Sequence, residues 1–442
     1  MERTEFRKLL FEEALKQGCE AAETYYAAEE SFSCSILKGE VLRYKSSVEG
    51  GLNLRVKYKG KDGYAYTESM EEPEALVARA IDNAAAVETG DEHPMQSAQE
   101  YATIKRRNNP VMDMDANEKI ELAKRLEAAA LAADPLIERV GQSQVATSIG
   151  VEEIHNTLGL KAERSMRQAV SVVAPIAKKN ERVKDSYAFR IGEEVLDVEG
   201  CADEAVQKAV LSLDASPCLT GRYDIVLENM AAADLLAAFS GIFSAEEAQK
   251  GRSLLRGKEG ESVAADCVTI VDDPFHPAAP RAFDSEGTPA RFKKVVENGV
   301  LNTLLHNLKT AKKAGVETTG NAFRSGAASS IGVGPTVFYI QAGETPFDEL
   351  IRRLNNGLLI TEIAGLHAGL DPVSGDFSLM ASGRLVKEGK LGEAVDQITV
   401  AGNFLSFMRS VELVGSDIKE TLAQTTVLCP SLLVRDISVA GK

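Results

Sequence analysis

The sequence predicts an α+β protein with two domains, an N-terminal α/β domain and a C-terminal β-rich, barrel-like domain. Three observations support this class. The 442 residues are 44% hydrophobic, which is enough to form two cores. In the first half, helical spacing alternates with strand-like alternation, whereas short strand patterns dominate the second half. Pro217 and Gly221 interrupt the pattern between the halves, so we assign residues 1–218 and 219–442 to the two domains.

The N-terminal domain is predicted to repeat one unit of helix, antiparallel strands and helix. A first helix ends at Gly18, and an Ala-rich helix at residues 72–87 closes the first unit. In the second unit, Asp115 and Glu118 form a capping-box pattern at the start of a helix. Strands are expected at residues 24–28, 31–37, 41–47, 51–58 and 63–67, and then at 137–146, 152–157, 161–174 and 186–191, before a helix at 202–213. Two such units place helices on one face of a curved antiparallel sheet, with a long polar loop at residues 89–110 between them.

The C-terminal domain is predicted to be a strongly curved antiparallel sheet. Asn298-Gly299 predicts a type I′ hairpin, and Glu388-Gly389 predicts a similar turn. A strand at residues 223–227 is followed by an Ala-rich helix, and further helices are expected at 308–314 and 344–355. The remaining strands are expected at residues 291–296, 300–306, 357–363, 378–386, 395–401, 408–414 and 431–440.

Composition narrows the function classes. The net charge is −16, with 50 basic and 66 acidic residues, which argues against nucleic acid as the main partner because phosphate binding needs clustered Lys and Arg. No apolar stretch approaches the length of a membrane span, and the charged amphipathic N-terminus is unlike a secretory signal. The six cysteines form no CxxC pattern, which is typical of free thiols in a reducing compartment. We therefore expect a cytoplasmic protein without a membrane or nucleic-acid partner.

Five segments of the second half, taken in order, carry a resemblance to a known family. They are residues 283–324 (FDSEGTPARF to TTGNAFR), LLITEIAG at 358–365, SGDFS at 374–378, ITVAGN at 398–403 and CPSLLVRDISVAGK at 429–442. Together they resemble the TldD/PmbA family, some members of which are labelled modulators of DNA gyrase, and specifically its PmbA (TldE) branch. The resemblance implies that a TldD-like zinc peptidase subunit and a PmbA-like subunit pair and process peptides. It also implies that the TldD branch binds zinc through an HExxxH helix and a cysteine near the C-terminus.

The HExxxH motif is absent from this sequence. Glu228 and Asn229 occupy the strand-to-helix junction where the resemblance places histidines, and Cys429 keeps the position of the family's cysteine. Zinc requires imidazole or thiolate ligands at fixed spacing, which this helix does not supply. The alternative is that Glu228 and Asn229 begin the helix as capping residues, and that Cys429 is a buried thiol. We assign no catalytic residue, no metal ligand and, without a phosphate-binding glycine motif, no cofactor.

Polar loop residues of the second half are the other site candidates. Asp284 and Glu286, two residues apart, suit acid–base chemistry or binding of a peptide amine, or else a turn in which carboxylates accept backbone N–H groups. Asn321 is expected in a tight turn, and Arg324 is expected to pair with a substrate carboxylate or, more simply, with Asp284 or Glu286. We expect one cavity to collect Asp284, Glu286, Asn321, Arg324 and Cys429. The loop histidines His276 and His367 are expected to be solvated or structural rather than ligands.

Three functions remain open. The first is a non-catalytic, peptide-handling subunit of a cytosolic metallopeptidase complex, forming a homodimer or a heterodimer with a TldD-like subunit. In this case an extended peptide is expected to pair with a β edge of the C-terminal domain. The second is a stand-alone hydrolase that uses Asp284 and Glu286, or Cys429, with an unusual metal site. The third is a regulatory binding protein.

Overall fold

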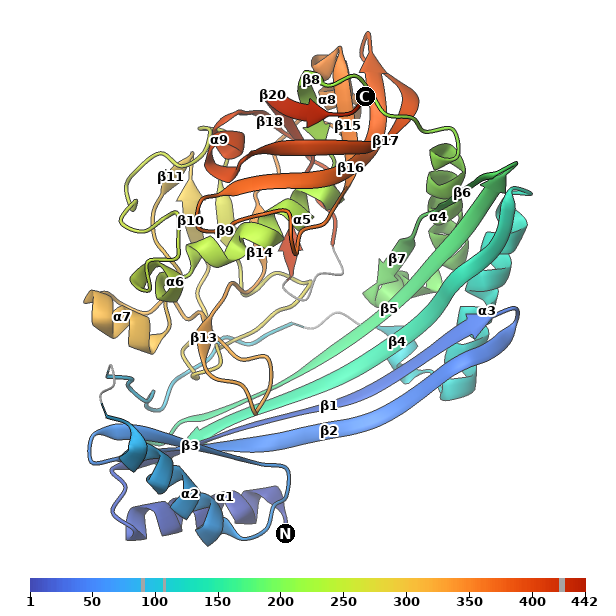
Figure 1. Ribbon diagram of the computed structural model, residues 1–442. Helices are drawn as coiled ribbons and strands as arrows, with labels where there is room; N and C mark the ends of the chain where they lie inside the picture. Colours follow the sequence, from blue (N-terminus) through green and yellow to red (C-terminus); the bar gives the residue numbers. More distant parts are fainter. Residues whose placement is uncertain (89–91, 106–108, 421–425) are drawn as a thin grey trace.

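The computed structural model describes residues 1–88, 92–105, 109–420 and 426–442. A long curved sheet with helices forms the first half of the chain, and a barrel-containing second half lies against the concave face of that sheet (Figure 1). The predicted α+β class, with its repeated first half and barrel-like second half, is confirmed. Within the described ranges, no helix is both long enough and apolar enough to cross a membrane.

The first half contains the predicted unit twice. The first unit consists of α1 (Arg3–Lys16), β1 (Ala21–Leu37), β2 (Glu40–Tyr58), β3 (Lys61–Thr67) and α2 (Pro73–Ala86). The second consists of η1 (Pro110–Asp113), α3 (Ala116–Ala133), β4 (Ile137–Asn156), β5 (Lys161–Lys179), β6 (Arg182–Asp185), β7 (Ala188–Ile191), η2 (Gly192–Leu196) and α4 (Val198–Ser212). The strands form one sheet in the order β3-β2-β1-β4-β5-β6, with β7 also on β5, so β1 and β4 join the two units at its centre.

The four α-helices in the described part of this half, α1 to α4, cover the same face of the sheet. Ala22 of β1 packs with α1 and α2, whereas Cys34 of the same strand packs with α3 and α4. Both are even-numbered and no bulge separates them, so their side chains point to one face. The odd-numbered Glu23 and Tyr25 point to the other face, which meets the second half of the chain. The second unit begins as predicted, with a complete capping box between Asp115 and Glu118.

The long strands differ from the prediction, which divided them. β1 runs through residues 29–30 without interruption, and β2 and β4 likewise run through residues 48–50 and 147–151. The alternation is lost there because the helices cover only the two ends of the sheet, so neither face of the middle must be apolar (Figure 1). Backbone pairing continues regardless, with Glu29 of β1 between Glu49 of β2 and Gly150 of β4.

The second half contains a closed five-stranded barrel. Strands β8 (Gly221–Leu227), β15 (Gly357–Ala364), β16 (Asp376–Lys387), β17 (Lys390–Asn403) and β20 (Leu432–Ala440) pair in a ring, and β18 (Val411–Val414) adds to β20. Helix α5 (Asn229–Phe239) follows β8 and packs in the large core of this half, whereas α8 (Phe347–Leu354) packs against the outer side of β8.

A second sheet and several short elements complete this half. The sheet has the order β11-β10-β9-β14-β19, formed by β9 (Ile270–Asp272), β10 (Lys293–Glu297), β11 (Val300–Leu301), β14 (Phe338–Ile340) and β19 (Val427–Leu428). The other elements are η3 (Ser240–Phe243), α6 (Ala245–Gln249), α7 (Leu308–Ala314), β12 (Ala322–Phe323), β13 (Gly332–Val333) and α9 (Phe404–Arg409). The predicted hairpin joins β10 to β11, with positive φ at Asn298 and Gly299, as a type I′ turn requires.

Two predicted strands of this half were wrong in part. The strand predicted at residues 300–306 ends at Leu301, with one isolated bridge at Leu305. The other is the strand predicted at residues 408–414. Residues 408–409 end helix α9, and the strand starts only at Val411. Phe404, Phe407 and Met408 are buried in the core at helical spacing, and this packing decides the conformation.

Candidate functional site

The loop at residues 283–288 meets the free face of the long sheet. Phe283 packs with Tyr25, Ile154 and Leu160 of the first half, and the guanidinium of Arg164 lies over its ring. Gly287 has a positive φ, and a Cβ there would lie 2.6 Å from Leu160. The loop is therefore a tight contact between the two halves, and it brings its polar side chains to their boundary.

Asp284 is a turn carboxylate. Its Oδ1 accepts hydrogen bonds from the backbone N–H groups of Glu286 (2.9 Å) and Thr288 (3.0 Å), and its Oδ2 accepts one from Ala322 (2.9 Å). Burial, followed by the nearby charge of Glu286, raises the pKa of Asp284 to about 7. Both carboxylate oxygens therefore accept backbone hydrogen bonds, as in the turn that the sequence suggested as the alternative to acid–base chemistry.

Glu286 reaches a histidine from the other half of the chain. One carboxylate oxygen contacts Nε2 of His93, and the other accepts a hydrogen bond from the backbone N–H of Leu308 at 2.8 Å. Burial raises the pKa of Glu286 to about 7, against the opposing effects of that N–H group and of Arg55 and Arg324. Burial, reinforced by Arg55, lowers the pKa of His93 to about 3, so this imidazole is neutral at pH 7.

Arg55 lies beside this pair and carries a buried positive charge. It forms ion pairs with Glu23 (3.8 Å) and Asp62 (3.2 Å), and it donates hydrogen bonds to the carbonyl oxygens of His93 and Pro94. Burial raises the pKa of Glu23, whereas the charge of Arg55 opposes that rise. In a protein with only two layers, this face of the sheet would be exposed to water. Here it is buried and carries a network of charged side chains.

Asn321 holds the adjoining turn. Its Nδ2 donates to Asp272 (2.8 Å) and to the carbonyl of Gly334 (3.1 Å), and its Oδ1 accepts from Lys293 (3.0 Å) and Thr319 (2.7 Å). All of its polar atoms have partners, so its part in the site is to fix the chain between β10 and β13.

Arg324 lacks the ion pair with Asp284 or Glu286 that the sequence suggested. Its residue exposure is 6%, and its guanidinium lies 4.8 Å from the centre of the Tyr25 ring. One Nη donates to the carbonyl of Ser329 at 2.8 Å, and Nε is buried without a partner. No carboxylate of the described chain forms an ion pair with it. Burial lowers the pKa of Arg324.

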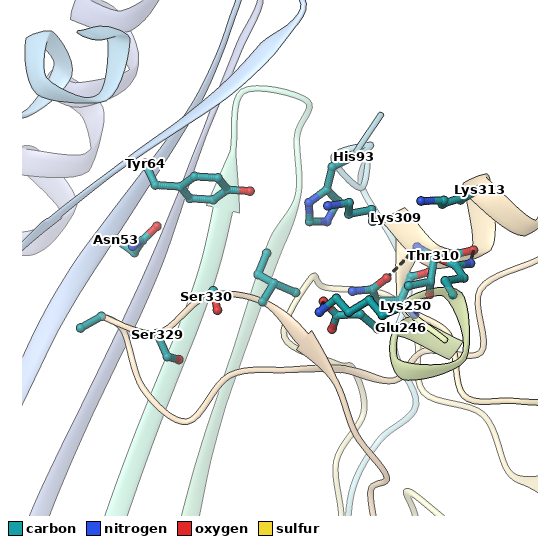
Figure 2. Close-up of a pocket in the computed structure, with 14 residues that line it drawn as sticks. Asn53, Tyr64, His93, Glu246, Lys250, Lys309, Thr310, Lys313, Ser329 and Ser330 are labelled. Atoms are coloured by element: carbon teal, nitrogen blue, oxygen red, sulfur yellow. Dashed lines mark hydrogen bonds and ion pairs between the residues drawn. The ribbon is translucent and has the colours of Figure 1, made fainter. Parts of the chain in front are cut away.

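A cavity of about 500 Å³ opens beside His93 (Figure 2). In the close-up, the side chains of His93 and Lys309 lie next to each other, with Tyr64 of β3 across from them. Burial raises the pKa of Tyr64 to about 12, so this phenol is neutral. The other walls come from α6, α7 and residues 328–331. The cavity therefore lies on the boundary between the two halves.

Glu228, Asn229 and Cys429 form a second group at the start of α5. Asn229 donates to the carbonyl of Asp417 at 2.8 Å, and Asp417 also accepts from Ser431 at 2.6 Å. Cys429 has an exposure of 0%, and burial together with Asp417 raises its pKa well above the usual range. The seven candidate residues thus lie in two groups. Asp284, Glu286, Asn321 and Arg324 lie at the domain boundary, whereas Cys429 lies near Asp417, which is hydrogen-bonded to the start of α5.

Glu228 is the N-cap residue of α5, but its side chain makes no capping hydrogen bond. It lines a cavity of about 260 Å³ between the barrel and α4, together with Lys208, Glu362 and Lys419. Burial raises the pKa of Glu228, whereas the two lysines lower it. Burial and the charge of Glu362 raise the pKa of Asp234, further along α5, to about 6. This cavity is acidic and lysine-lined rather than histidine-lined.

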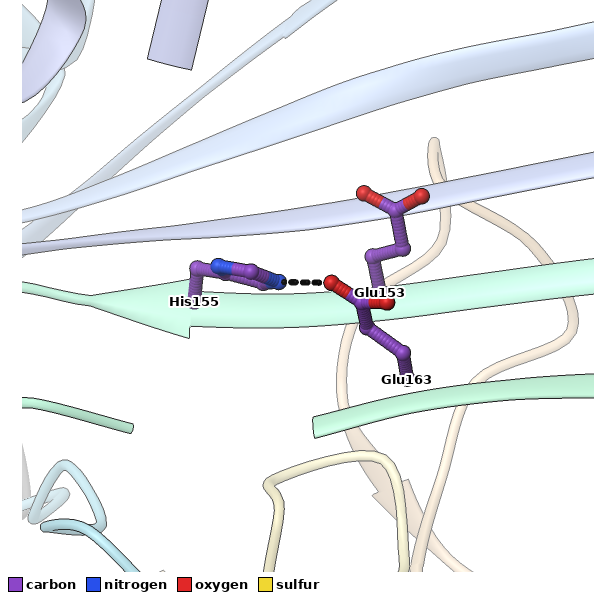
Figure 3. A group of neighbouring side chains, drawn as sticks. All are labelled: Glu153, His155 and Glu163. Atoms are coloured by element: carbon purple, nitrogen blue, oxygen red, sulfur yellow. Dashed lines mark hydrogen bonds and ion pairs between the residues drawn. The ribbon is translucent and has the colours of Figure 1, made fainter. Parts of the chain in front are cut away.

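The donor sets do not fit a zinc centre. Across the described ranges, one group of possible metal ligands is close enough to share an ion, namely Glu153, His155 and Glu163 (Figure 3). Arg7 already pairs with Glu153 and lies 3.0 Å from Nδ1 of His155, so an arginine occupies the place of a cation. At α5 the donors near Cys429 are carboxylates without imidazole, whereas zinc sites use histidine and cysteine.

The two loop histidines have no place in either group. His276 packs against the ring of Tyr339 at 5.5 Å, and its Nδ1 accepts a hydrogen bond from the backbone N–H of Ala278 at 3.2 Å. His367 is exposed in the loop after β15.

Sequence reasoning did not find His93, Arg55 and Glu23. Arg55 stands between Leu54 and Val56, where alternation assigns it to a solvent face. The available signal was that two strands, each with an apolar face under helices, carried Glu23 and Arg55 on their other face. To recognise Glu23 and Arg55 as buried from this signal, one must know that a second layer covers that face.

Comparisons with known proteins cover the whole chain. Family models match residues 22–84 (PmbA/TldA metallopeptidase domain 1), 109–213 (central domain) and 220–441 (C-terminal domain). A metalloprotease of Methanothermobacter thermautotrophicus is 30% identical over 392 residues, covering 86% of this chain and 85% of that protein. The metalloprotease PmbA of Escherichia coli O157:H7 is 25% identical, covering 99% of this chain and 98% of that protein.

Two solved structures share the fold. A Thermotoga maritima protein, described as a candidate modulator of a DNA gyrase, has a TM-score of 0.91 and 32% identity, covering 99% of this chain and 100% of that one. TldE of Thermococcus kodakarensis has a TM-score of 0.89 and 22% identity over the same shares, which shows likeness of fold.

Proposed function

The chain belongs to the PmbA/TldD metallopeptidase family, and we propose that it is a non-catalytic, peptide-handling subunit of a cytosolic TldD/TldE-type metallopeptidase complex. The observation that carries the proposal is the start of α5. Glu228 and Asn229 stand where the resemblance places histidines, and Asn229 is hydrogen-bonded to Asp417. A helix with this donor set does not supply zinc ligands.

The groups that an independent hydrolase would use are engaged in the fold. Asp284 accepts three backbone hydrogen bonds, and Glu286 is shared between His93 and Leu308. Cys429 is fully buried, and its raised pKa keeps the thiol protonated and weakly nucleophilic. These contacts favour the subunit over a stand-alone peptidase. A regulatory binding role, the third candidate, has no contact that favours it over the subunit.

The proposed partner is a TldD-like zinc subunit, and the alternative assembly is a homodimer. The chain is similar both to PmbA-type relatives and to a metalloprotease TldD homolog of Haemophilus influenzae, at 25% identity over 435 residues. Subunits that share one fold can pair through equivalent surfaces, which favours a two-fold arrangement. The substrates proposed for the complex are peptides.

The test is co-purification followed by assay. The tagged chain is expressed in its native host, and the captured proteins are identified by mass spectrometry and sized by light scattering. We expect a chain with an HExxxH motif to co-purify, and we expect peptide cleavage from the pair but not from this chain alone. Cleavage by the chain alone at the rate of the pair, or a monomer at tens of micromolar with and without the partner, would contradict the proposal.

A further inference from the structure

An open groove of about 1070 Å³ runs between the long sheet and the loop at residues 324–329. Figure 1 shows this loop, which precedes β13, reaching the concave face of the sheet. The floor comes from the middle of β1, β2, β4 and β5, and its small residues are Ala27, Ala28, Gly50, Gly51 and Gly150. The ring of Tyr66 covers Gly51, since a Cβ there would lie 2.4 Å from the Tyr66 hydroxyl. The other small residues of the floor allow the main chain of a ligand to approach the sheet closely.

Arg324 lines this groove, and its charge is incompletely satisfied. Its exposure is 6%, its Nε has no hydrogen-bond partner, and its protein contacts are one carbonyl (Ser329) and the face of the Tyr25 ring. The charges of Glu23 and Glu286 act on Arg324, but neither carboxylate forms an ion pair with its guanidinium. A buried guanidinium without a carboxylate in direct contact is costly, because its lost hydration is only partly compensated. The geometry therefore leaves room for one anion at this end of the groove.

Three other buried arginines near this sheet have the carboxylate partner that Arg324 lacks. Arg7 pairs with Glu153, Arg55 with Glu23 and Asp62, and Arg164 with Glu152 at 2.6 Å. Arg281 also has no carboxylate partner in the described chain, but it does not line the groove. Arg324 is thus set apart by being both unpaired and placed where a ligand can reach it.

The rest of the groove has the opposite charge. Its lining includes Glu29, Glu49, Glu68 and Glu152. Glu152 is neutralised by Arg164 and Glu49 by Lys45, whereas Glu29 pairs with no cation of the described chain. Carboxylates along the groove disfavour a phosphate or an acidic peptide, which would carry negative charge past them. They suit a ligand with one carboxylate at its end and neutral or basic groups before it.

We propose that Arg324 binds the C-terminal carboxylate of an extended peptide that lies in this groove. The inference rests on the proposed peptide-handling function and names its ligand class. It places the peptide over the sheet of the first half rather than at a β edge of the barrel. An arginine fork matches a carboxylate in a planar, two-hydrogen-bond geometry, and Nε can be one of the two donors.

The spacing along β1 adds a second element of specificity. Tyr25, beneath Arg324, and Glu29 lie on the same face of the strand, four residues apart, which corresponds to about 13 Å at 3.3 Å per residue. An extended peptide bound at Arg324 therefore brings its fourth residue from the end close to Glu29. A lysine or arginine at that place is expected to strengthen binding.

The experiment measures fluorescence anisotropy of labelled eight-residue peptides with the full chain. One peptide, of alanine and serine with lysine fourth from the end, has a free C-terminal carboxylate. The second is its C-terminal amide, and the third is an amide that ends in aspartate. We expect the amide to bind about tenfold to a hundredfold more weakly, the loss of one charged hydrogen-bonded pair. If the amide that ends in aspartate recovers the affinity, the site binds any carboxylate. If it does not, the site is specific for the C-terminal carboxylate.

The variants fix the residue responsible. Arg324→Gln should bind the free acid and the amide equally, Arg324→Lys should keep part of the preference, and Glu29→Gln should remove the advantage of the peptide lysine. The matched control is Arg43→Gln, an exposed arginine on β2, which should leave all affinities unchanged. Thermal melts verify that each variant is folded. If Arg324→Gln does not fold, Arg324→Lys is used in its place.

Three results overturn the inference, and they separate it from the proposed function. If the wild-type chain binds the free-acid peptide and its amide equally, Arg324 does not bind the C-terminal carboxylate, but the proposed peptide-handling function is not contradicted. If no peptide binds, either to the chain or to its complex with the partner, both fall. A change of oligomeric mass in Arg324→Gln without a change in peptide preference would assign Arg324 to an interface and also overturn it.

Discussion

The carboxylate of Glu286 contacts Nε2 of His93, a residue 193 positions earlier in the chain. Both side chains are buried, and the contact joins the loop at residues 283–288 to the segment after α2. The pKa of the acid is raised to about 7 and that of the imidazole is lowered to about 3, so neither keeps the charge state that it has in water at mildly acidic pH. The boundary between the two halves is therefore sensitive to protons.

Replacing Glu286 with Gln should make stability less dependent on pH. The folded-state pKa of about 7 lies above the usual value of 4.5, so the folded state keeps a proton that the unfolded state has released. Stability from this group is present below about pH 4.5 and is lost as the pH rises through 7. The free energy of unfolding of Glu286→Gln relative to wild type should therefore rise by about 1 kcal/mol or more between pH 5 and pH 8.

The measurement is urea denaturation at pH 5, 6, 7 and 8. His93 titrates in the opposite sense, since its lowered pKa adds stability as the pH rises from 3 to 6.5, but it is present in both proteins. Glu181→Gln, at an exposed position, is the control and should show a difference that does not change with pH. A flat difference for Glu286→Gln as well would contradict the raised pKa.

Arg55→Met should lower the free energy of unfolding by about 3–5 kcal/mol, because it leaves the buried Glu23 without its counter-charge. Adding Glu23→Gln to this variant removes the uncompensated charge and should restore part of the loss. Urea denaturation of both variants measures this. Arg43→Met, exposed on the same strand, should change stability by less than about 0.5 kcal/mol. Equal losses in the single and double variants would show that shape, not charge, is responsible.

Gly63→Ala should destabilise the first unit by about 1–3 kcal/mol through overpacking. A Cβ at Gly63 would lie 1.9 Å from the carbonyl oxygen of Ala80 and 2.6 Å from the nitrogen of Ala84, both in the backbone of α2. Backbone cannot move aside as a flexible side chain can, so helix and strand must separate. The check is the unfolding midpoint, compared with Gly241→Ala, where nothing lies within 4 Å of the new methyl group. A wild-type midpoint for Gly63→Ala would show that α2 shifts at no cost.

The purified chain should hold far less than one zinc per molecule. The start of α5 offers carboxylates without imidazole, and Arg7 occupies the Glu153 and His155 cluster. Elemental analysis after gel filtration in buffer with a weak chelator measures this, with a TldD-like subunit that has HExxxH as the positive control. About one zinc per chain would contradict it, and loss of that zinc in Glu153→Gln would then locate the ion.

The sequence predicted those features that a few neighbouring residues determine. The capping box of Asp115 and Glu118 and the hairpin turn at Asn298-Gly299 are set by local hydrogen bonds and backbone preference, and both were found. The contact of His93 with Glu286 is not local. It depends on the second half of the chain covering a sheet face that looks solvent-exposed when β1 and β2 are considered alone. For the same reason Arg324 was expected beside Glu286, whereas the fold places it on Tyr25.

The pairing of β8 with β20 has a consequence for biosynthesis. Residues 221–227 need residues 432–439 as their partner, and β20 also closes the ring on β17. At 5–20 residues per second, the roughly 200 intervening residues take ~10–40 s to translate. During that interval the nascent barrel is an open sheet with an unpaired, largely apolar edge at β8. The long sheet of the first half can form meanwhile, because its strands are already complete. The second half therefore exposes an unpaired strand edge during synthesis for longer than the first half does.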